Sequence, residues 1–148
     1  MADQQYTISE FAAKVGLSSY TLRYYEKEGL LAPHRSHNGR RYYTDQDVKW
    51  LVFILHLKGT GMSMSQLQDY VRWRSEGDAT IPQRLALLQT VQRDAQARIR
   101  ELQANLEVLG HKIDWYAGKE AATIDEDESF AAYLKRIGAI DERDGQDE

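Results

Sequence analysis

The chain has 148 residues, of which 42% are apolar and 28% charged, and its formal net charge is −4. It contains no cysteine, which excludes disulfides, thiolate metal sites, iron-sulfur clusters and thiol-based redox sensing. The longest apolar run, residues 50–55, is too short to span a bilayer, and residues 1–5 lack the basic and apolar regions of a signal peptide, so we expect a cytoplasmic protein without a membrane partner.

The first predicted elements are two short helices joined by a tight turn. Residues 7–10 have the hydroxyl-x-x-Glu form of a capping box, which predicts a helix that reaches Val15. Gly16 then permits the backbone of a tight turn. One of the serines at positions 18 and 19 caps a second helix that reaches about Lys27. Two short helices joined in this way predict a helix-turn-helix.

Residues 31–43 differ in kind because they hold a proline, an Asn-Gly pair and two adjacent tyrosines. Asn38-Gly39 is the strongest short-range signal for a tight hairpin turn. The residues around this pair include three arginines and two histidines. The pattern predicts a two-stranded ribbon with a basic tip.

Two further helices follow the ribbon. Residues 44–47 cap a third helix that runs to Lys58 and ends at the glycines that follow it. A fourth helix begins at Ser63 or Ser65 and reaches about Trp73. Gly77-Asp78 is predicted to be a linker, and Pro82 suits the first turn of the next helix.

A seven-residue repeat then runs from Leu85 to Tyr116, with spacings of three and four that never slip. Its predicted interface positions are Leu85, Leu88, Ile99, Leu102, Leu106, Leu109 and Ile113. A repeat of this length buries a narrow apolar seam against a partner helix, and a helix of roughly 54 Å (at ~1.5 Å per residue) is too long to bury it on a small domain. We therefore expect a homodimer. The alternative is a helix that lies along its own N-terminal domain.

The C-terminal part is predicted to be short and acidic. Gly118 is expected to end the coil, and the acidic run at residues 125–128 is suited to a helix N-terminus. Phe130, Leu134 and Ile137 are spaced as the apolar stripe of a short helix, while residues 141–148 have a composition typical of disorder.

These elements predict a mainly α protein with three parts. A winged helix-turn-helix DNA-binding domain with a two-stranded wing occupies residues 1–76. A dimerisation coiled coil follows at residues 77–118, and an acidic tail with one helix occupies residues 119–148.

The second helix and the ribbon carry the residue types that contact DNA. Hydroxyls and guanidinium groups donate hydrogen bonds to phosphate oxygens and base edges, and a recognition helix presents its N-terminal side chains in the major groove. Residues 14–58 hold eight basic and four acidic side chains, whereas residues 81–148 hold nine basic and fourteen acidic ones. The predicted DNA contacts are Ser18, Tyr20, Thr21, Arg23, Tyr24, Tyr25, Arg35, Arg40, Arg41, Tyr42 and Lys58.

Several of these assignments have a structural alternative. The charge asymmetry is also that of an ordinary, unevenly charged surface. Arg23 has Glu26 and Glu28 as alternative ion-pair partners, and Arg35 is equally suited to a solvated loop. Tyr25 is compatible with a packed ring, a phosphate contact or both, whereas Tyr43 is expected to pack inward.

In combination, the Leu-Arg-Tyr-Tyr-Glu segment at residues 22–26, the Gly-Leu that follows it and the basic Tyr-Tyr wing resemble the DNA-binding domain of the MerR family. The resemblance covers residues 6 to about 117. It implies that the coiled coil is antiparallel between two protomers. It also implies that the dimer binds a near-palindromic promoter and distorts the DNA so that RNA polymerase can use it, at a deformation cost of roughly 1–6 kcal/mol.

Within that family, residues 58–62 and 109–116 resemble short regulators tied to aldehyde or electrophile stress. Many of these carry a reactive cysteine where this sequence has His56, and imidazole does not reproduce thiolate chemistry. A structural role for His56, half-buried near the partner's coil, is favoured over sensing.

Because thiol-based sensing is excluded, the effector that we expect, if there is one, is an apolar or aromatic small molecule. Its candidate contacts are His56, Tyr70, Trp73, Trp115 and Tyr116, for each of which a packing role is favoured.

Other functions have less support in the sequence. The four histidines are dispersed without metal-ligand spacing, so no metal or other cofactor is expected. There is no nucleophile-base constellation or phosphate loop, so no enzymatic activity is expected. The alternatives are a simple repressor or architectural DNA-binding protein without an effector, and a coiled-coil scaffold that binds an acidic protein.

Overall fold

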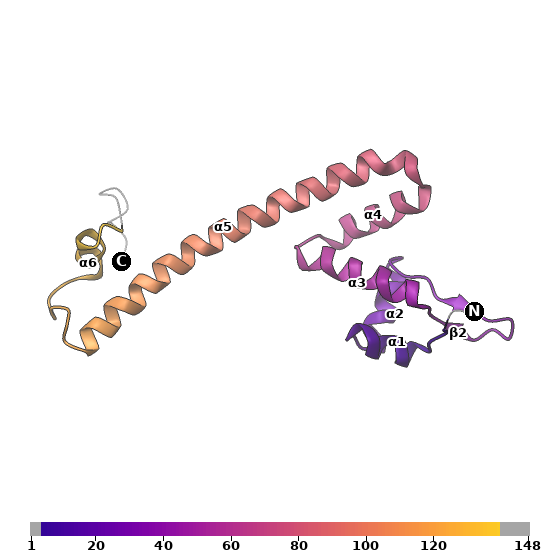
Figure 1. The fold of residues 1–148 in the computed structure, drawn as a ribbon, viewed down its shortest axis with the longest axis horizontal. Coiled ribbons are helices and arrows are strands. Elements are labelled where there is room, and N and C mark those ends of the chain that lie inside the picture. The colour runs from indigo at the N-terminus through magenta and orange to yellow at the C-terminus, as the bar shows by residue number, and fades with distance from the viewer. Residues whose placement is uncertain (1–3, 140–148) are drawn as a thin grey trace. The chain divides into compact units, whose positions relative to one another are not determined.

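The computed structural model describes residues 4–139 and is mainly helical, as the sequence predicts. The chain divides into two compact units, of which the first ends at Ala95 and the second begins at Gln96. The elements, in chain order, are α1 (Ile8–Val15), α2 (Ser19–Lys27), β1 (His34–Arg35), β2 (Arg41–Tyr42), α3 (Asp45–Gly59), α4 (Met64–Glu76), the 3-10 turn η1 (Asp78–Thr80), α5 (Ile81–Glu120) and α6 (Phe130–Arg136) (Figure 1).

Local capping places the two helices of the helix-turn-helix. The Thr7 hydroxyl accepts a hydrogen bond from the Glu10 amide at 3.2 Å, and the Glu10 carboxylate accepts one from the Thr7 amide at 3.1 Å, so the predicted capping box is confirmed. Gly16 ends α1 in the left-handed conformation with φ of 72°, which a side chain would disfavour. Ser18 then caps α2 by accepting a hydrogen bond from the Thr21 amide at 3.1 Å.

The wing is an antiparallel pair in which His34 lies opposite Tyr42 and Arg35 lies opposite Arg41. The tight hairpin turn predicted at Asn38-Gly39 is present, and its geometry is not that of a type I′ turn. Gly39 has φ of 81°, but Asn38 does not have a positive φ, as both central residues of a type I′ turn would. The Gly39 amide instead donates to the Ser36 carbonyl at 2.9 Å, and Gly39 occupies the left-handed position that closes a longer loop.

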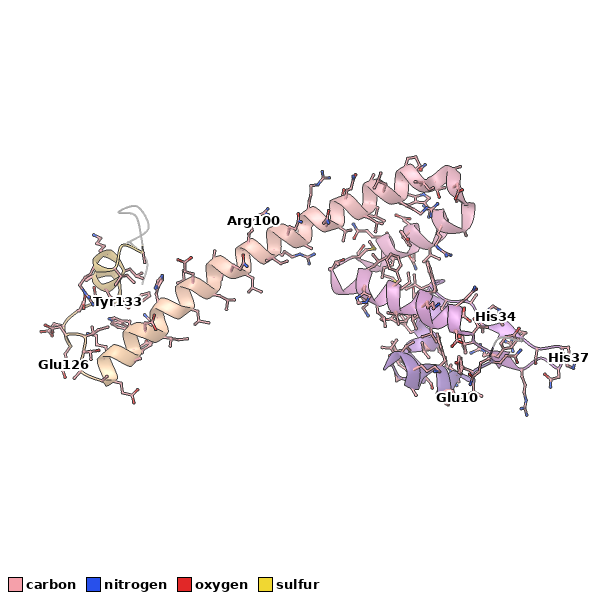
Figure 2. The ribbon with its side chains drawn as sticks, viewed as in Figure 1. Glu10, His34, His37, Arg100, Glu126 and Tyr133 are labelled. Carbon is pink, nitrogen blue, oxygen red and sulfur yellow. The ribbon has the colours of Figure 1, made fainter. Side chains whose placement is uncertain are left out.

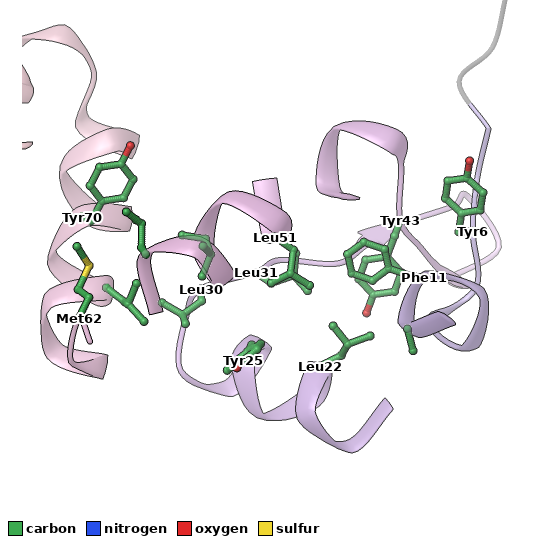
Figure 3. Packing of buried hydrophobic residues seen from close by; sticks show 14 of the residues in the cluster. Tyr6, Phe11, Leu22, Tyr25, Leu30, Leu31, Tyr43, Leu51, Met62 and Tyr70 are labelled. Carbon is green, nitrogen blue, oxygen red and sulfur yellow. The ribbon is translucent and has the colours of Figure 1, made fainter. Parts of the chain in front are cut away.

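The first unit has one apolar core, to which α1, α2, α3, α4 and the start of α5 contribute (Figure 3). Phe11, Leu22, Tyr43 and Leu51 have no exposed surface. The rings of Phe11 and Tyr43 stack with centroids 4.5 Å apart and an interplanar angle of 6°. Tyr43 also pairs its backbone with that of Tyr6, which fixes the end of the wing to the N-terminal segment.

The long helix α5 behaves differently along its length. Val91 is buried in the core of the first unit, and Leu87 and Leu88 pack against that core, so the first turns of α5 do lie along their own domain. Beyond this stretch the interface positions from Ile99 to Ile113 are exposed in the single chain. The alternative of a helix packed on its own domain therefore describes the start of α5.

Some predicted boundaries are wrong. Helix α4 extends three residues beyond Trp73, and the expected linker at Gly77-Asp78 leads into η1. Gly118 does not end the coil, because α5 continues to Glu120. The residues 141–148, predicted to be disordered, lie outside the described range.

In the second unit, α6 packs against the end of α5. Phe130 lies 5.6 Å from Trp115 between ring centroids, and the Trp115 indole N–H donates to the Glu128 carbonyl at 3.2 Å. Between these helices, the Ile124 side chain lies against Gly118, where a Cβ would overlap it. Tyr133 and Leu134 are buried, whereas Ile137 is exposed and does not complete the predicted stripe. Within residues 4–139, none of the helices combines the length and the apolar character that crossing a membrane requires.

Candidate nucleic-acid interface

Helix α2 has a buried face and an exposed face, and the predicted DNA contacts divide between them. Leu22 and Tyr25 are buried in the core, whereas Tyr20, Arg23 and Tyr24 point to solvent. Tyr20 is 83% exposed, which is unusual for a tyrosine in a folded domain without a bound partner. Among the described residues, Arg23 has no ion-pair partner, so the alternative pairing with Glu26 or Glu28 is not present in the structure.

Ser18 and Thr21 lie at the N-terminus of α2, where the helix dipole and free amides favour a phosphate. Their hydroxyl oxygens are 2.9 Å apart and hydrogen-bond to each other. Ser18 is exposed and Thr21 is half-buried. Both hydroxyls thus have local partners, and each keeps a lone pair or proton for one external contact.

Tyr25 and Lys58 form a pair within the domain. The Tyr25 ring is 2% exposed, and its hydroxyl accepts a hydrogen bond from the Lys58 ammonium at 2.7 Å. The ring of Tyr25 therefore packs in the core, which selects the packed alternative for this residue. Lys58 is exposed, but its ammonium contacts Tyr25. The geometry of the free chain therefore gives no support to the prediction that Lys58 contacts DNA.

The wing carries three arginines and a tyrosine that were predicted to contact DNA, and these side chains differ in the contacts that they make within the chain. Arg40 is exposed and, within residues 4–139, its side chain has no ion-pair partner. Arg35 is exposed and donates to the Gly39 carbonyl at 3.1 Å across the loop. Tyr42 is half-buried and stacks on His34 with ring centroids 5.2 Å apart. Figure 2 shows His34 at the base of the wing and His37 at its tip.

Arg41 is tied to the recognition helix. Its guanidinium lies 3.1 Å from the Glu26 carboxylate, and the Tyr43 hydroxyl donates to the same carboxylate. Burial and the hydrogen bond to Glu26 raise the pKa of Tyr43 well above its ordinary value, so the hydroxyl remains a donor. The sequence did not predict this cluster, because its members are 15 and 17 residues apart and no local pattern connects them.

The wing is also tied to α3. The His34 imidazole lies 3.0 Å from the Asp47 carboxylate, which also accepts a hydrogen bond from the Thr44 amide at 2.8 Å and thereby closes the capping box of α3. The nearby Tyr6 hydroxyl donates to Asp45 at 2.7 Å, and this hydrogen bond raises the pKa of Tyr6. Each strand of the wing therefore has its own contact with a helix.

The residues predicted as effector contacts fall into two groups, one in each unit. Tyr70 packs against Trp50 and Phe53, with ring centroids 6.3 and 5.8 Å away, and it is buried. Trp73 is half-buried beneath the Arg72 guanidinium, and His56 is exposed in the single chain, so that its burial near the partner's coil stays a prediction. Trp115 and Tyr116 belong to the second unit, where the Lys112 ammonium lies 4.8 and 5.4 Å from their ring centroids. Within residues 4–139, no group of three His, Asp or Glu side chains is placed to hold a metal ion.

The predicted dimer residues are nearly all exposed in the single chain. Only Leu88 is partly buried, since it packs against the core of its own unit. The exposed members of the seam are Leu85, Ile99, Leu102, Leu106, Leu109 and Ile113.

Comparison with known families and proteins agrees with this geometry. Residues 6–73 match the family described as "MerR HTH family regulatory protein", and residues 48–112 match the one described as "MerR, DNA binding". An uncharacterised HTH-type transcriptional regulator of Haemophilus influenzae is 39% identical over 118 residues, which are 78% of this chain and 87% of that protein. The regulator AdhR of Bacillus subtilis is 39% identical over 82 residues, or 55% of this chain and 59% of AdhR.

Solved structures give the same result. The crystal structure of HiNmlR, a MerR-family regulator that lacks the sensor domain and is bound to promoter DNA, has a TM-score of 0.73 and 37% identity over 80% of this chain and 94% of that one. A MerR-family regulator of Listeria monocytogenes also has a TM-score of 0.73, with 31% identity over 89% of this chain and 96% of that one. The chain therefore belongs to the MerR family of helix-turn-helix regulatory proteins.

Proposed function

We propose that this chain regulates transcription by binding promoter DNA as a homodimer through α2 and the wing. The observation that carries the proposal is the exposed set on α2, where Tyr20, Arg23 and Tyr24 point to solvent beside a wing that carries Arg35 and Arg40. Large aromatic and arginine side chains left exposed on a helix are suited to bases and phosphates. The likeness to HiNmlR, which is described as bound to promoter DNA, supports the same conclusion.

The exposed seam of α5 supports the homodimer. Six large apolar side chains are more than half exposed along one stripe from Leu85 to Ile113, which is more than a stable monomer leaves uncovered. An antiparallel pairing of two such helices covers both stripes and holds two recognition helices apart, as binding to two half-sites requires. Part of this proposal is the division of the chain into a DNA-binding domain (residues 1–76), a coil (77–118) and a tail (119–148).

The proposed mechanism is distortion of the promoter, so that RNA polymerase recognises elements that are otherwise poorly placed. Bending DNA costs roughly 1–6 kcal/mol, which clustered phosphate contacts at the wing and α2 offset. A regulator of this kind acts where the chromosome is, so the expected cytoplasmic location belongs to the proposal. The alternative is a simple repressor or architectural protein that binds without distorting the DNA.

A role in aldehyde or electrophile stress is a narrower proposal. It is supported by the 39% identity with AdhR over 55% of this chain and by the resemblance of residues 58–62 and 109–116 to that subgroup. With no cysteine in the sequence, a signal of this kind reaches the protein by a route other than a thiolate. A small-molecule effector near Trp115 and Tyr116 is one such route.

The DNA-binding surface is tested by Arg23→Ala, with Arg100→Ala on α5 as the control that removes the same charge elsewhere. Affinity for duplex DNA is measured by fluorescence anisotropy across a range of salt concentrations. We expect Arg23→Ala to weaken binding and to reduce the slope of log K against log salt by about 0.9, the value for one phosphate contact. Equal slopes for both variants and the wild-type protein would contradict the assigned face.

The distortion is tested separately from binding. A relaxed plasmid that carries the bound promoter is treated with topoisomerase in the presence and absence of the protein, and its linking number is then measured. Underwound product supports the proposed mechanism. An unchanged linking number, with binding intact, favours the simple repressor.

A further inference from the structure

A carboxylate lies inside the basic surface assigned to DNA binding. Glu26 is on α2, one turn after Arg23, and its side chain is 10% exposed. Phosphate-facing surfaces gain affinity from positive charge, so a nearby carboxylate reduces the attraction for any duplex. General affinity for DNA therefore does not explain why the Glu26 carboxylate lies in this surface, and the side chain must have another role.

The contacts of Glu26 join two parts of that surface. One carboxylate oxygen lies 3.1 Å from the Arg41 guanidinium on β2, and the other accepts a hydrogen bond from the Tyr43 hydroxyl. Arg41 and Tyr43 belong to the wing and its end, whereas Glu26 belongs to the recognition helix. A single side chain therefore connects the two elements that are expected to contact DNA.

The connection is rigid at its wing end. Tyr43 has no exposed surface, stacks on Phe11 and exchanges two backbone hydrogen bonds of 2.8 and 2.9 Å with Tyr6. A fixed tyrosine that donates to Glu26 holds the carboxylate in one place, and the carboxylate in turn holds the Arg41 fork, since a charge-assisted hydrogen bond is strongly directional. The second contact of the wing, His34 with Asp47, reaches α3 and not the recognition helix.

We propose that Glu26 is a positioning residue that helps the protein to distinguish its operator from other DNA sequences. This inference rests on the proposed function. Glu26 holds Arg41 and the wing in one arrangement relative to α2, so that the arginine reaches the DNA backbone only when α2 is correctly docked on its bases. A free Arg41 would pair with phosphates of any sequence, because phosphate contacts carry no sequence information of their own. Glu26 thus lowers non-specific affinity and preserves the difference between an operator and other DNA.

The test is Glu26→Gln, whose amide oxygen still accepts from Tyr43 but cannot form the ion pair with Arg41. Glu28→Gln is the matched control. It removes the same charge two residues away, where the carboxylate accepts a hydrogen bond from Gln68 of α4 rather than contacting the wing. The probes are a duplex that the wild-type protein selects from a random pool and an unrelated duplex of the same length. Thermal unfolding is recorded for each variant.

We expect Glu26→Gln to bind the unrelated duplex more tightly, with a salt slope steeper by about 0.9, since Arg41 gains a phosphate contact. The ratio of the two affinities should fall by roughly tenfold, as for the loss of one positioned contact. Glu28→Gln should leave that ratio unchanged. An unchanged ratio and slope in Glu26→Gln, or equal changes in both variants, would overturn the proposal, because a purely structural or purely electrostatic role predicts those outcomes.

Arg41→Gln keeps the test decisive if Glu26→Gln unfolds, because Arg41 is on the surface. Removing the Arg41 guanidinium from an otherwise wild-type protein should reduce the affinity for the selected duplex more than for the unrelated one. Equal losses on both duplexes would overturn the proposal. A wild-type protein that selects no duplex at all contradicts the proposed function instead, so the two failures are distinguishable.

Discussion

The first unit and the exposed stretch of α5 use similar apolar side chains in opposite ways. On α3, Leu51 and Ile54 are buried in a core that their own chain completes. On α5, Leu102 and Leu106 occur at equally regular spacing and are 60% and 55% exposed. The apolar positions of α3 are covered by neighbouring helices of the same chain, whereas those of α5 face solvent in the single chain and are covered only in the proposed homodimer.

Leu102→Asp should break this comparison with the largest effect. A carboxylate in the seam is desolvated when two helices pair, so we expect monomers in analytical ultracentrifugation at concentrations where the wild-type protein is dimeric. Losing the second DNA-binding module should lower the affinity for a two-half-site duplex by about 100-fold or more. Val108→Asp is the control, because Val108 is 57% exposed on α5 but lies outside the heptad seam. A Leu102→Asp dimer of wild-type stability would contradict the proposed pairing.

Leu51→Ala should have the next largest effect, and on a different property. Leu51 has no exposed surface, so its truncation leaves a cavity that lowers the free energy of unfolding by about 2–5 kcal/mol. The neighbouring Val52 is 40% exposed, and Val52→Ala should cost under about 1 kcal/mol. Urea denaturation at one protein concentration compares them, and similar losses in both variants would show that the core is not where the structure places it.

Thr7→Ala sharpens the comparison at the level of a single helix. The Thr7 hydroxyl caps α1, which is too short to be stable without its cap and its packing. We expect a loss of about 0.5–2 kcal/mol in the free energy of unfolding. Thr90→Ala on α5 is the control, since that hydroxyl bonds a carbonyl within an established helix and caps nothing. Equal costs would argue against a capping role.

Glu10→Gln should have the smallest effect, which is present near neutral pH and disappears in acid. Hydrogen bonds from Thr7 lower the pKa of Glu10 below its ordinary value of 4.5. A carboxyl with a lowered folded pKa contributes stability that is present above 4.5 and is lost as the pH falls through the folded pKa. The stability difference between wild type and variant should therefore shrink between about pH 5 and about pH 3. Parallel curves across this range would show that the carboxylate contributes nothing.

Local signals predicted most of the elements, because each depends on residues close together in the chain. The capping box at residues 7–10, the α2 serine cap and the heptads of α5 all involve spacings of three or four residues. Gly118 was expected to end the coil, but α5 continues to Glu120, and the side chain of Ile124 lies against Gly118.

The candidate site shows the same division between local and distant effects. The sequence predicted that Tyr20, Arg23 and Tyr24 share a helix near a basic wing, and the structure leaves these side chains exposed. It could not predict that Tyr25 packs inward and bonds Lys58, because the two are 33 residues apart. Nor could it predict that Glu26 pairs with Arg41, since the two are distant in the chain and the local spacing offered Arg23 as an alternative partner.

The amino-acid sequence alone determined the helix-turn-helix, the presence of a wing and the heptad repeat of the long helix, because helix caps and periodicities are short-range properties of the backbone. The tertiary structure decided which side chains of α2 remain free and that Glu26 joins the wing to the recognition helix. Both features depend on how segments distant in the chain pack around one core. The neighbours that bury a side chain or pair with its charge come from these distant segments, and no local pattern identifies them.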